Sequence, residues 1–339
     1  MTFRFFEGKI ITMNVTLNKG KLVRYAFLLA AAILWGFSFV AQAVDEIAPF
    51  TFTATRSLIG AAVLVPVFLV MDAVRKKKGD VPVPSPEERK KGRTLLLLGG
   101  MICGVVICVA TNLQQFGLSM NLEAGKAGFI TAMYIVLVPI IGLFQGKKSN
   151  FLVWISVALA VVGLYFVSVK GAFTINAGDL CLIFCAVAFS VHITVVDYFG
   201  NRVDGVKLSC LQFLFSGLFS ALLALIFERD RFDISLLLSY YKTFLYMGVC
   251  SCGIAYTFQI VGQKNTNPTA ASLIMSLEAS FSLIFGMIFL GERLTVREWI
   301  GITLMVVAIV LTETKELFTK VPTTKASAPK ETDATDVRS

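Results

Sequence analysis

Apolar residues form long, almost uninterrupted runs along this chain. A helix that crosses a lipid bilayer needs about 20 consecutive, mostly apolar residues, and ten runs approach this length. The ten predicted spans are 26–44, 49–71, 94–118, 124–144, 151–169, 178–199, 206–227, 243–263, 268–290 and 297–312. Strands of alternating hydrophobicity are absent from the pattern, which excludes an outer-membrane barrel. The sequence therefore predicts an all-α membrane protein with ten transmembrane helices.

The second half of the chain repeats part of the first half. Residues 94–169 align without a gap with residues 239–314, and Gln114 falls opposite Gln259. Each half holds five predicted spans, so the second half would enter the membrane from the opposite side. Inverted repeats of this kind are found in secondary transporters, which bind substrate between the two copies. We therefore expect two inverted five-helix repeats.

The repeat also suggests where the chain divides. We expect a cytoplasmic N-terminal segment over residues 1–23, a first repeat over 24–170 and a second repeat over 171–314. The remaining residues, 315–339, are rich in lysine, threonine, alanine, proline and acidic residues. A segment with so few large apolar side chains cannot bury enough surface to fold, so we expect a disordered cytoplasmic tail.

Composition and charge agree with a membrane protein. Hydrophobic residues make up 56% of the chain and charged residues only 16%, whereas soluble domains average about 25% charged residues. The net charge of +9 could suggest nucleic acid, but most of the 31 lysines and arginines lie on the side of the two termini, many of them in the 72–93 loop. This is the positive-inside bias. It predicts a multi-pass protein of the cytoplasmic membrane with both termini in the cytoplasm, a lipid partner and no nucleic-acid partner.

The pattern of reactive residues argues against an enzyme. All seven cysteines lie inside apolar runs, His192 is the only histidine, and no metal-binding spacing is present. Walker A, HExxH and GxSxG sequences are also absent. An aspartyl pair of Asp45 and Asp197 would lie at opposite ends of the spans. We therefore expect no cofactor and no metal. An intramembrane enzyme, a passive channel or a scaffold is the alternative to a transporter.

Four short segments resemble a known family: Leu34–Val40, Asn267–Ala271, Gly291–Thr295 and Trp299–Gly301. Together with the span order and the duplication, they resemble the EamA-type transporters of the drug/metabolite transporter superfamily. The resemblance implies a ten-helix bundle with a central cavity and alternating access. It also implies export or exchange of small metabolites, such as amino acids, across the cytoplasmic membrane. Many relatives have Glu-Pro in the ninth span, where this chain has Glu278-Ala279, so a proline break there is not expected.

Two ionisable residues lie near the middle of predicted spans, where a charge costs about 2.5–3.5 kcal/mol on insertion scales. Glu278 is about 15 Å into the ninth span, on a different face from a stripe of small residues formed by Ser272, Ser276 and Ser280. It could bind a substrate amine or a proton, or be a protonated structural carboxyl. His192 in the sixth span could accept a coupling proton, which makes a proton a candidate partner, or could be a neutral packing residue.

Three charged residues are candidates for a structural or gating role. Asp45 and Glu46 end the first span, and Arg56 lies near the start of the second, on the same side. An arginine–carboxylate pair could fix this first hairpin or latch an outer gate. The structural role is favoured, since arginine at this depth can also extend toward the interface.

Polar and aromatic residues supply the other substrate-binding candidates. Gln114 and Gln259 occupy matching positions in the two halves, and an unpaired amide facing lipid would be costly. They could bind substrate at the cavity wall or hydrogen-bond between helices. Weaker candidates for the cavity wall are Trp35, Ser38, Gln42, Asn112, Gln115, Tyr134 and Tyr256.

Overall fold

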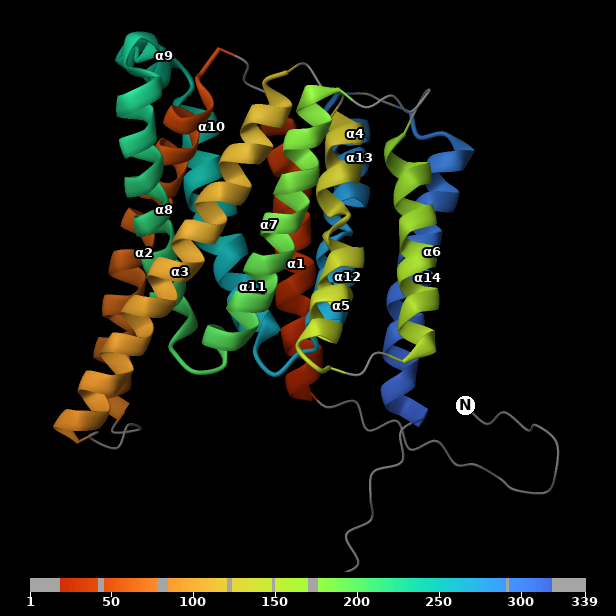
Figure 1. Ribbon diagram of the computed structural model, residues 1–339, viewed down its shortest axis with the longest axis horizontal. Helices are drawn as coiled ribbons and strands as arrows, with labels where there is room; N and C mark the ends of the chain where they lie inside the picture. The colour runs from red at the N-terminus through yellow and green to blue at the C-terminus, as the bar shows by residue number, and fades with distance from the viewer. Residues whose placement is uncertain are drawn as a thin grey trace, which may run out of the picture.

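The computed structural model describes residues 19–41, 46–78, 85–120, 124–147, 150–169, 176–290 and 293–318. Within these residues the regular structure is entirely helical, which confirms the predicted all-α class. The helices are α1 (Lys19–Ala41), α2 (Pro49–Lys78), α3 (Pro86–Leu118), α4 (Ala124–Ala132), α5 (Tyr134–Phe144), α6 (Phe151–Ser168), α7 (Ala177–Gly200), α8 (Gly205–Phe227), η1 (Arg229–Arg231), α9 (Ile234–Ser239), α10 (Tyr241–Leu245), η2 (Tyr246–Ala255), α11 (Tyr256–Gln263), α12 (Pro268–Met275), α13 (Glu278–Leu290) and α14 (Val296–Phe318). They stand side by side as a bundle (Figure 1).

Nine stretches in the described part of the chain are helical, long and apolar enough to cross a membrane. The predicted count of ten is therefore not confirmed. The difference lies in α14, which contains the tenth predicted span, 297–312. Its uncharged run from Trp299 to Thr312 is about 21 Å long, short of the ~30 Å hydrocarbon core, and is bounded by Glu298 and Glu313. Helix α14 also continues to Phe318, into the segment expected to be a disordered tail.

Two spans that the sequence presents as continuous are broken near their middles. The fourth span divides into α4 and α5 at Met133, and the ninth divides into α12 and α13 at Ser276 and Leu277. No proline causes the second break. Instead, the Ser276 hydroxyl donates to the Leu273 carbonyl at 2.8 Å, a local bond that competes with the helical ladder. The two breaks lie at closely aligned positions of the repeat, since Met133 falls opposite Glu278.

The eighth span changes its helical type along its length. It starts as the α-helix α10, widens into the π-helix η2, and continues as the α-helix α11. Short π segments inside α-helices often mark functional sites, because the wider turn redirects the side chains that follow it.

The charged loop predicted over 72–93 is largely helical. Helix α2 continues to Lys78, and α3 begins at Pro86. The Ser85 hydroxyl accepts a bond from the Glu88 backbone N–H at 3.2 Å, and the Glu88 carboxylate accepts one from the Ser85 backbone N–H at 2.9 Å. This capping box, with proline at the first helical position, sets the start of α3.

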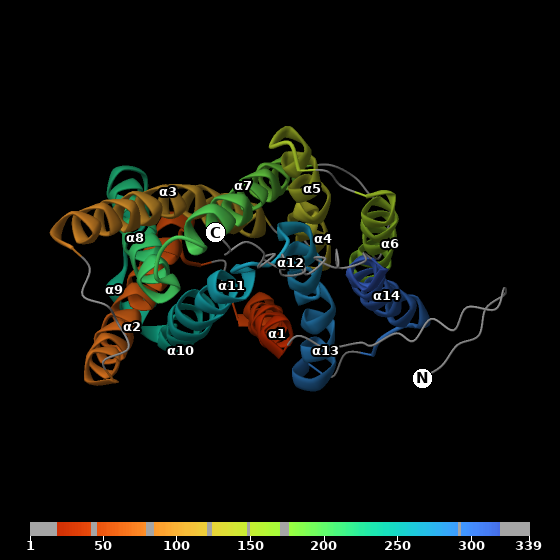
Figure 2. The ribbon, with the colours of Figure 1, turned by 90° about the horizontal axis from the view of Figure 1, so that it is seen from below.

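Helices from the two halves of the chain pack against each other in a symmetric pattern. Helix α2 packs on α8 and α6 on α14, while α3 packs on α7 and α1 packs on η2 and α11 (Figures 1 and 2). If the two halves are exchanged, the α2–α8 and α6–α14 contacts map onto themselves, and the α3–α7 contact maps onto the contacts of α1 with η2 and α11. The α6–α14 crossing is especially close, because a Cβ on Gly163 would lie 2.7 Å from the Gly301 carbonyl oxygen. Small residues allow such approach between membrane helices.

Charged side chains join α2 and α8 at the end of the bundle drawn at the bottom of Figure 1, where α1 begins. We call it the lower end. Arg75 lies 2.6 Å from Asp204 and Lys207 lies 2.7 Å from Asp72. Burial raises the pKa of Asp204, but hydrogen bonds from Arg75 and from the Lys207 backbone outweigh that effect, so this pKa lies below its ordinary value.

The opposite end of the α2–α8 pair is held by a buried carboxylate. Glu228 follows the last residue of α8 and is 6% exposed. Its oxygens accept hydrogen bonds from the backbone N–H groups of Phe50 and Thr51 at 2.9 and 2.7 Å, and from the Thr51 hydroxyl at 2.8 Å. An anion is favoured here by the unpaired N–H groups at the start of α2. The two halves of the chain are thus joined at both ends of this pair.

Candidate functional site

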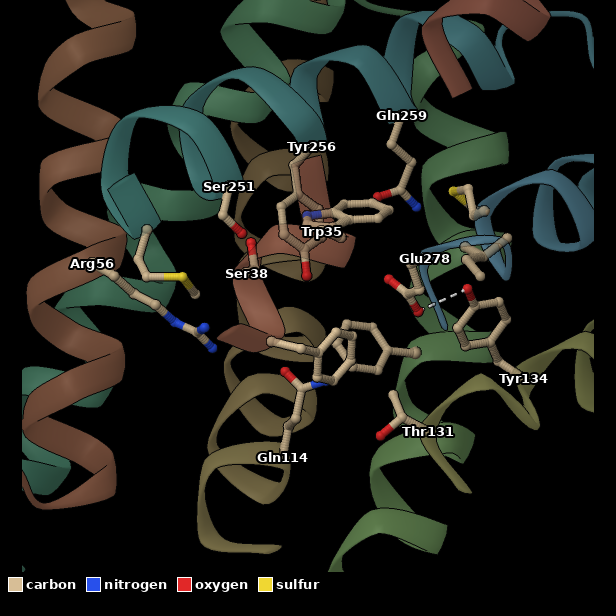
Figure 3. A pocket seen from close by; sticks show the side chains of 15 residues that line it. Trp35, Ser38, Arg56, Gln114, Thr131, Tyr134, Ser251, Tyr256, Gln259 and Glu278 are labelled. Carbon is tan, nitrogen blue, oxygen red and sulfur yellow. Dashed lines mark hydrogen bonds between the residues drawn. The ribbon is translucent and has the colours of Figure 1, made fainter. Parts of the chain in front are cut away.

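A central cavity lies where the two broken spans meet the π-helix. Its lining residues are Trp35, Ser38, Phe39, Arg56, Gln114, Thr131, Tyr134, Phe189, Ile193, Met247, Ser251, Tyr256, Gln259, Met275 and Glu278 (Figure 3). They come from both halves of the chain. The cavity volume is about 50 Å³, enough for a few water molecules but far below the ~300–1,000 Å³ of typical ligand pockets. A metabolite would fit only if the helices moved apart.

One wall of the cavity carries a cation. Arg56 projects from α2 and is 4% exposed. Its guanidinium carbon lies 5.5 Å from the centre of the Phe52 ring, one helical turn earlier on α2. A guanidinium presents several N–H donors in a plane, which suits a carboxylate better than a single ammonium does.

The opposite side of the view in Figure 3 carries the carboxyl group of Glu278. Glu278 is 7% exposed and lies in the first turn of α13, where the helix dipole favours negative charge. The Tyr134 hydroxyl donates a hydrogen bond to Glu278 Oε1 at 3.2 Å. Tyr134 is the first residue of α5 and Glu278 the first of α13, so this bond joins the broken spans of the two halves.

Tyr256 forms the aromatic centre of the site. Its ring lies 4.7 Å from the Trp35 ring and 5.0 Å from the Phe213 ring, in edge-on arrangements. The His192 ring lies 6.0 Å away. Edge-to-face aromatic contacts of this kind fix ring orientation, so the Tyr256 hydroxyl is held at the cavity between Arg56 and Glu278 (Figure 3).

The matched glutamines both line the cavity but differ in burial. Gln259, on α11, is 2% exposed, and its side-chain oxygen has no hydrogen-bond partner among the described residues. Gln114, on α3, is half-buried. A buried amide oxygen without a partner is costly, so Gln259 is suited to receive a donor from a bound molecule.

The structure brings together most of the residues proposed from the sequence. Trp35, Ser38, Gln114, Tyr134, Tyr256, Gln259 and Glu278 all line the cavity. Arg56, assigned from the sequence to a structural or gating role, lies there as well. Its proposed partner Glu46 instead accepts a hydrogen bond from the Tyr240 hydroxyl at 3.0 Å. Gln42 and Asp45 fall outside the described residues.

His192 lies behind the cavity wall rather than in it. It is fully buried, and its Nε2 is 3.1 Å from the Gln212 side-chain oxygen. It is not among the described residues that line the cavity and approaches it only through Tyr256. This placement fits the packing interpretation of His192 better than direct contact with a solute.

Two polar cavity residues were missed from the sequence. Thr131 precedes Tyr134 by three residues and therefore lies on the same helical side, a signal that could have identified it. Ser251 lies in the π-helix η2, and its direction depends on that wider turn, which the hydrophobic pattern does not reveal. The other missed lining residues are apolar: Phe39, Phe189, Ile193, Met247 and Met275.

These features together define a polytopic helical membrane protein with a charged, centrally placed cavity. Comparison with known families gives a more specific result. The sequence pattern of the EamA-like transporter family matches this chain twice, over residues 23–169 and 176–314. The chain belongs to the EamA-like transporter family, within the drug/metabolite transporter superfamily.

Individual relatives agree with this assignment. An uncharacterized transporter of Archaeoglobus fulgidus is 27% identical over 299 residues, covering 84% of this chain and 83% of the relative. An uncharacterized transporter of Synechocystis is 22% identical over 312 residues, covering 85% and 89%. A solved crystal structure has the same fold, with a TM-score of 0.66 and 18% identity, covering 88% of this chain and 97% of the other. The protein is thus a multi-pass membrane transporter.

Proposed function

We propose that this protein is a secondary transporter for a small zwitterionic metabolite of the amino-acid type, bound between Arg56 and Glu278. The carrying observation is that one buried arginine and one buried carboxyl group line the same cavity. Ionisable groups at this depth are costly and mark solute pathways. A molecule with a carboxylate and an ammonium can satisfy both groups at once.

Eight of the cavity residues have a role in this proposal. Arg56 binds the carboxylate of the solute through paired N–H donors. Glu278 binds the ammonium, and it exchanges its bond with Tyr134 for one with the solute. Gln259 accepts a further hydrogen bond, while Trp35 and Tyr256 pack against the apolar part of the solute. The side chains of Gln114 and Ser38 complete the polar lining.

The proposed mechanism is alternating access between two inverted five-helix repeats, over residues 24–170 and 171–314. It is supported by the symmetric packing of helices between the halves and by the aligned breaks near Met133 and Glu278. Broken helices at the repeat interface are typical of transporter binding sites. The concentration of basic residues at the lower end favours a cytoplasmic location for that end. We infer export or exchange across the cytoplasmic membrane.

A solute panel tests this function directly. Purified protein in proteoliposomes would be given radiolabelled α-amino acids, the same molecules lacking the carboxylate, and the same molecules lacking the amine. We expect only the zwitterions to be transported at appreciable rates. Equal uptake of all three classes, or of none, would contradict the proposal.

Two variants test the proposed roles of Arg56 and Glu278. Arg56→Gln and Glu278→Gln should each reduce kcat/KM for the zwitterion by about 100-fold, because losing one partner of a buried charge pair costs about 2–5 kcal/mol. Glu278→Gln should keep its remaining activity across pH, whereas the parent protein should not. Tyr134→Phe retains the Glu278 carboxyl group and serves as a control, with an expected loss in kcat/KM of about 5-fold. Full uptake by Glu278→Gln would remove this carboxylate from the mechanism.

A further inference from the structure

A second hollow opens at the lower end of the bundle, below the central cavity. Its volume is about 280 Å³, and its walls include Val138, Gln145, Lys147, Thr194, Asp197 and Thr269. These residues belong to α5 and the segment after it, to α7 and to α12. We call this hollow the vestibule. It is several times larger than the central cavity and is lined by groups from both halves of the chain.

The vestibule and the central cavity lie in register along the same three helices. On α5, Tyr134 lines the cavity and Val138 the vestibule. On α7, Ile193 lines the cavity, while Thr194 and Asp197 line the vestibule. On α12, Met275 lines the cavity and Thr269 the vestibule. At 1.5 Å per residue, the lining residues of the two hollows are separated by about 6 Å on α5 and about 9 Å on α12, and on α7 they are adjacent.

The two hollows meet at apolar side chains, since Val138 lines the vestibule and Ile193 and Met275 line the central cavity. Val138, Ile193 and Met275 are 2%, 3% and 1% exposed and belong to one packed cluster. Such a layer, about one to two helical turns thick, blocks polar solutes as hydrophobic constrictions do in channels. Because the layer is formed by both halves of the chain, separating the halves would open it.

An ion pair crosses the mouth of the vestibule. Lys147 Nζ lies 3.0 Å from Asp197 Oδ2, and the pair joins the segment after α5, in the first half, to α7, in the second. Asn201 donates to Asp197 through its side-chain nitrogen at 3.3 Å. The side-chain oxygen of Asn201 accepts a bond from the Asn265 backbone N–H at 2.8 Å, which ties this corner to the turn before α12. The segment after α5, helix α7 and the turn before α12 are thus linked beside the vestibule.

We propose that the vestibule is the entrance to the central cavity and that the Lys147–Asp197 pair closes it. A zwitterion can replace the pair without leaving an unpaired charge, since its carboxylate takes Lys147 and its ammonium takes Asp197. This exchange rests on the proposed function. The closing of the route by the ion pair does not, because it depends only on the geometry of the two hollows.

A labelling experiment tests the gate without any solute. Val138→Cys places a thiol in the apolar layer, and its reaction rate with a charged, water-soluble thiol reagent is measured on protein in detergent, against the background of the parent chain. Adding Lys147→Gln should raise this rate by about 2- to 5-fold, the range expected for loss of one exposed ion pair.

The chain offers a closely matched control. Arg75 and Asp204 form another ion pair between the two halves at the same end, with exposures of 47% and 20%. The values for Lys147 and Asp197 are 48% and 19%. Arg75→Gln should leave the labelling of Val138→Cys unchanged. Equal effects of the two substitutions, or no effect of Lys147→Gln, would overturn the gate.

Transport measurements test the exchange step separately. Lys147→Gln should raise KM for a transported zwitterion several-fold, whereas Arg75→Gln should not. An unchanged KM would overturn the exchange. If no zwitterion is transported at all, the proposed function fails, yet the difference in labelling between Lys147→Gln and Arg75→Gln would still decide whether the ion pair closes the route.

Discussion

Helix α3 and the segment from α10 to α11 are aligned in the duplication, yet they differ in structure and in what they contribute. Helix α3 is continuous from Pro86 to Leu118, and only Gln114 from it lines the cavity. Its counterpart contains the π-helix η2, and it supplies Met247, Ser251, Tyr256 and Gln259. Within this pair of aligned spans, most of the cavity-lining residues belong to the second copy.

The π-helix packs closely on α2. A Cβ on Gly248 would lie 2.4 Å from Ile59 Cγ2. A Cβ on Gly60 would lie 2.6 Å from Cys252 Cβ. Each helix therefore offers a glycine to a side chain of the other. In α3 the position aligned with Gly248 is Cys103, but α3 makes a comparably close contact with α8 through Gly100 and Gly104, whose Cβ atoms would lie 2.4 Å from Leu211 Cβ and 2.6 Å from Phe215 Cβ. Close packing is therefore common to both halves, while the residues that provide it differ.

The largest effect is expected at the π-helix itself. Gly248→Ala forces Ile59 and the α2 backbone to move, and overpacking of this kind costs up to about 3 kcal/mol. We expect a clearly lower midpoint of thermal unfolding in detergent, together with loss of uptake. Gly253→Ala is the control, because its Cβ would meet nothing closer than the Gly248 carbonyl oxygen at 3.4 Å. Equal stability of the two variants would show that the close contact between Gly248 and Ile59 does not contribute to the packing of the π-helix on α2.

A second comparison concerns how the halves begin their second helices. Helix α8 is capped by its own neighbour Asp204, which accepts from the Val206 and Lys207 backbone N–H groups at 3.0 and 3.1 Å. Helix α2 is capped from the other half, by Glu228. Glu228→Gln should lower the free energy of unfolding by about 2 kcal/mol, because buried hydrogen bonds to a charge are lost. Asp204→Asn should cost less, since asparagine also caps helices. The opposite order in thermal unfolding would contradict this interpretation.

The matched glutamines give a smaller and more specific test. Gln259→Met keeps the volume but removes the buried oxygen available to a ligand, and it should weaken zwitterion binding about 5-fold. Gln114→Met should weaken it about 2-fold, because Gln114 is less buried. Binding can be measured by calorimetry on purified protein. Equal losses would indicate that the two halves share the solute symmetrically.

The smallest effect is expected from pH at the lower end. The pKa of Asp204 is lowered in the folded protein, so its contribution to stability is present above the unfolded value of about 3.9 and is lost as pH falls through the folded value. The contribution should be a few tenths of a kcal/mol, since the site is partly exposed. The unfolding midpoint of the parent protein should exceed that of Asp204→Asn at pH 6, and the two should converge as the pH falls below the ordinary pKa range of aspartate. A constant difference would exclude Asp204 ionisation as its source.

Hydrophobic runs were sufficient to predict the helical class and the positions of nine of the spans. The cost of burying polar groups in lipid was sufficient to bring Gln114, Gln259 and Glu278 into one site. Both arguments depend on averages over many residues. The break at Ser276 involves a single hydroxyl bond, and neither this break nor the widening in η2 leaves a trace in the apolar pattern. The sequence placed Arg56 correctly in its helix, but its position on the cavity wall depends on how the helices pack, which the apolar pattern does not show.

The hydrogen bond between Tyr134 and Glu278 has a mechanical consequence. It connects the two points at which the fourth and ninth spans are interrupted, and it ends on the oxygen that an incoming ammonium would seek. Under the proposed function, a solute ammonium that bound this oxygen would compete with the tyrosine and would separate the lower part of one half from the upper part of the other. Binding of the solute and separation of the two interrupted spans would then be a single event.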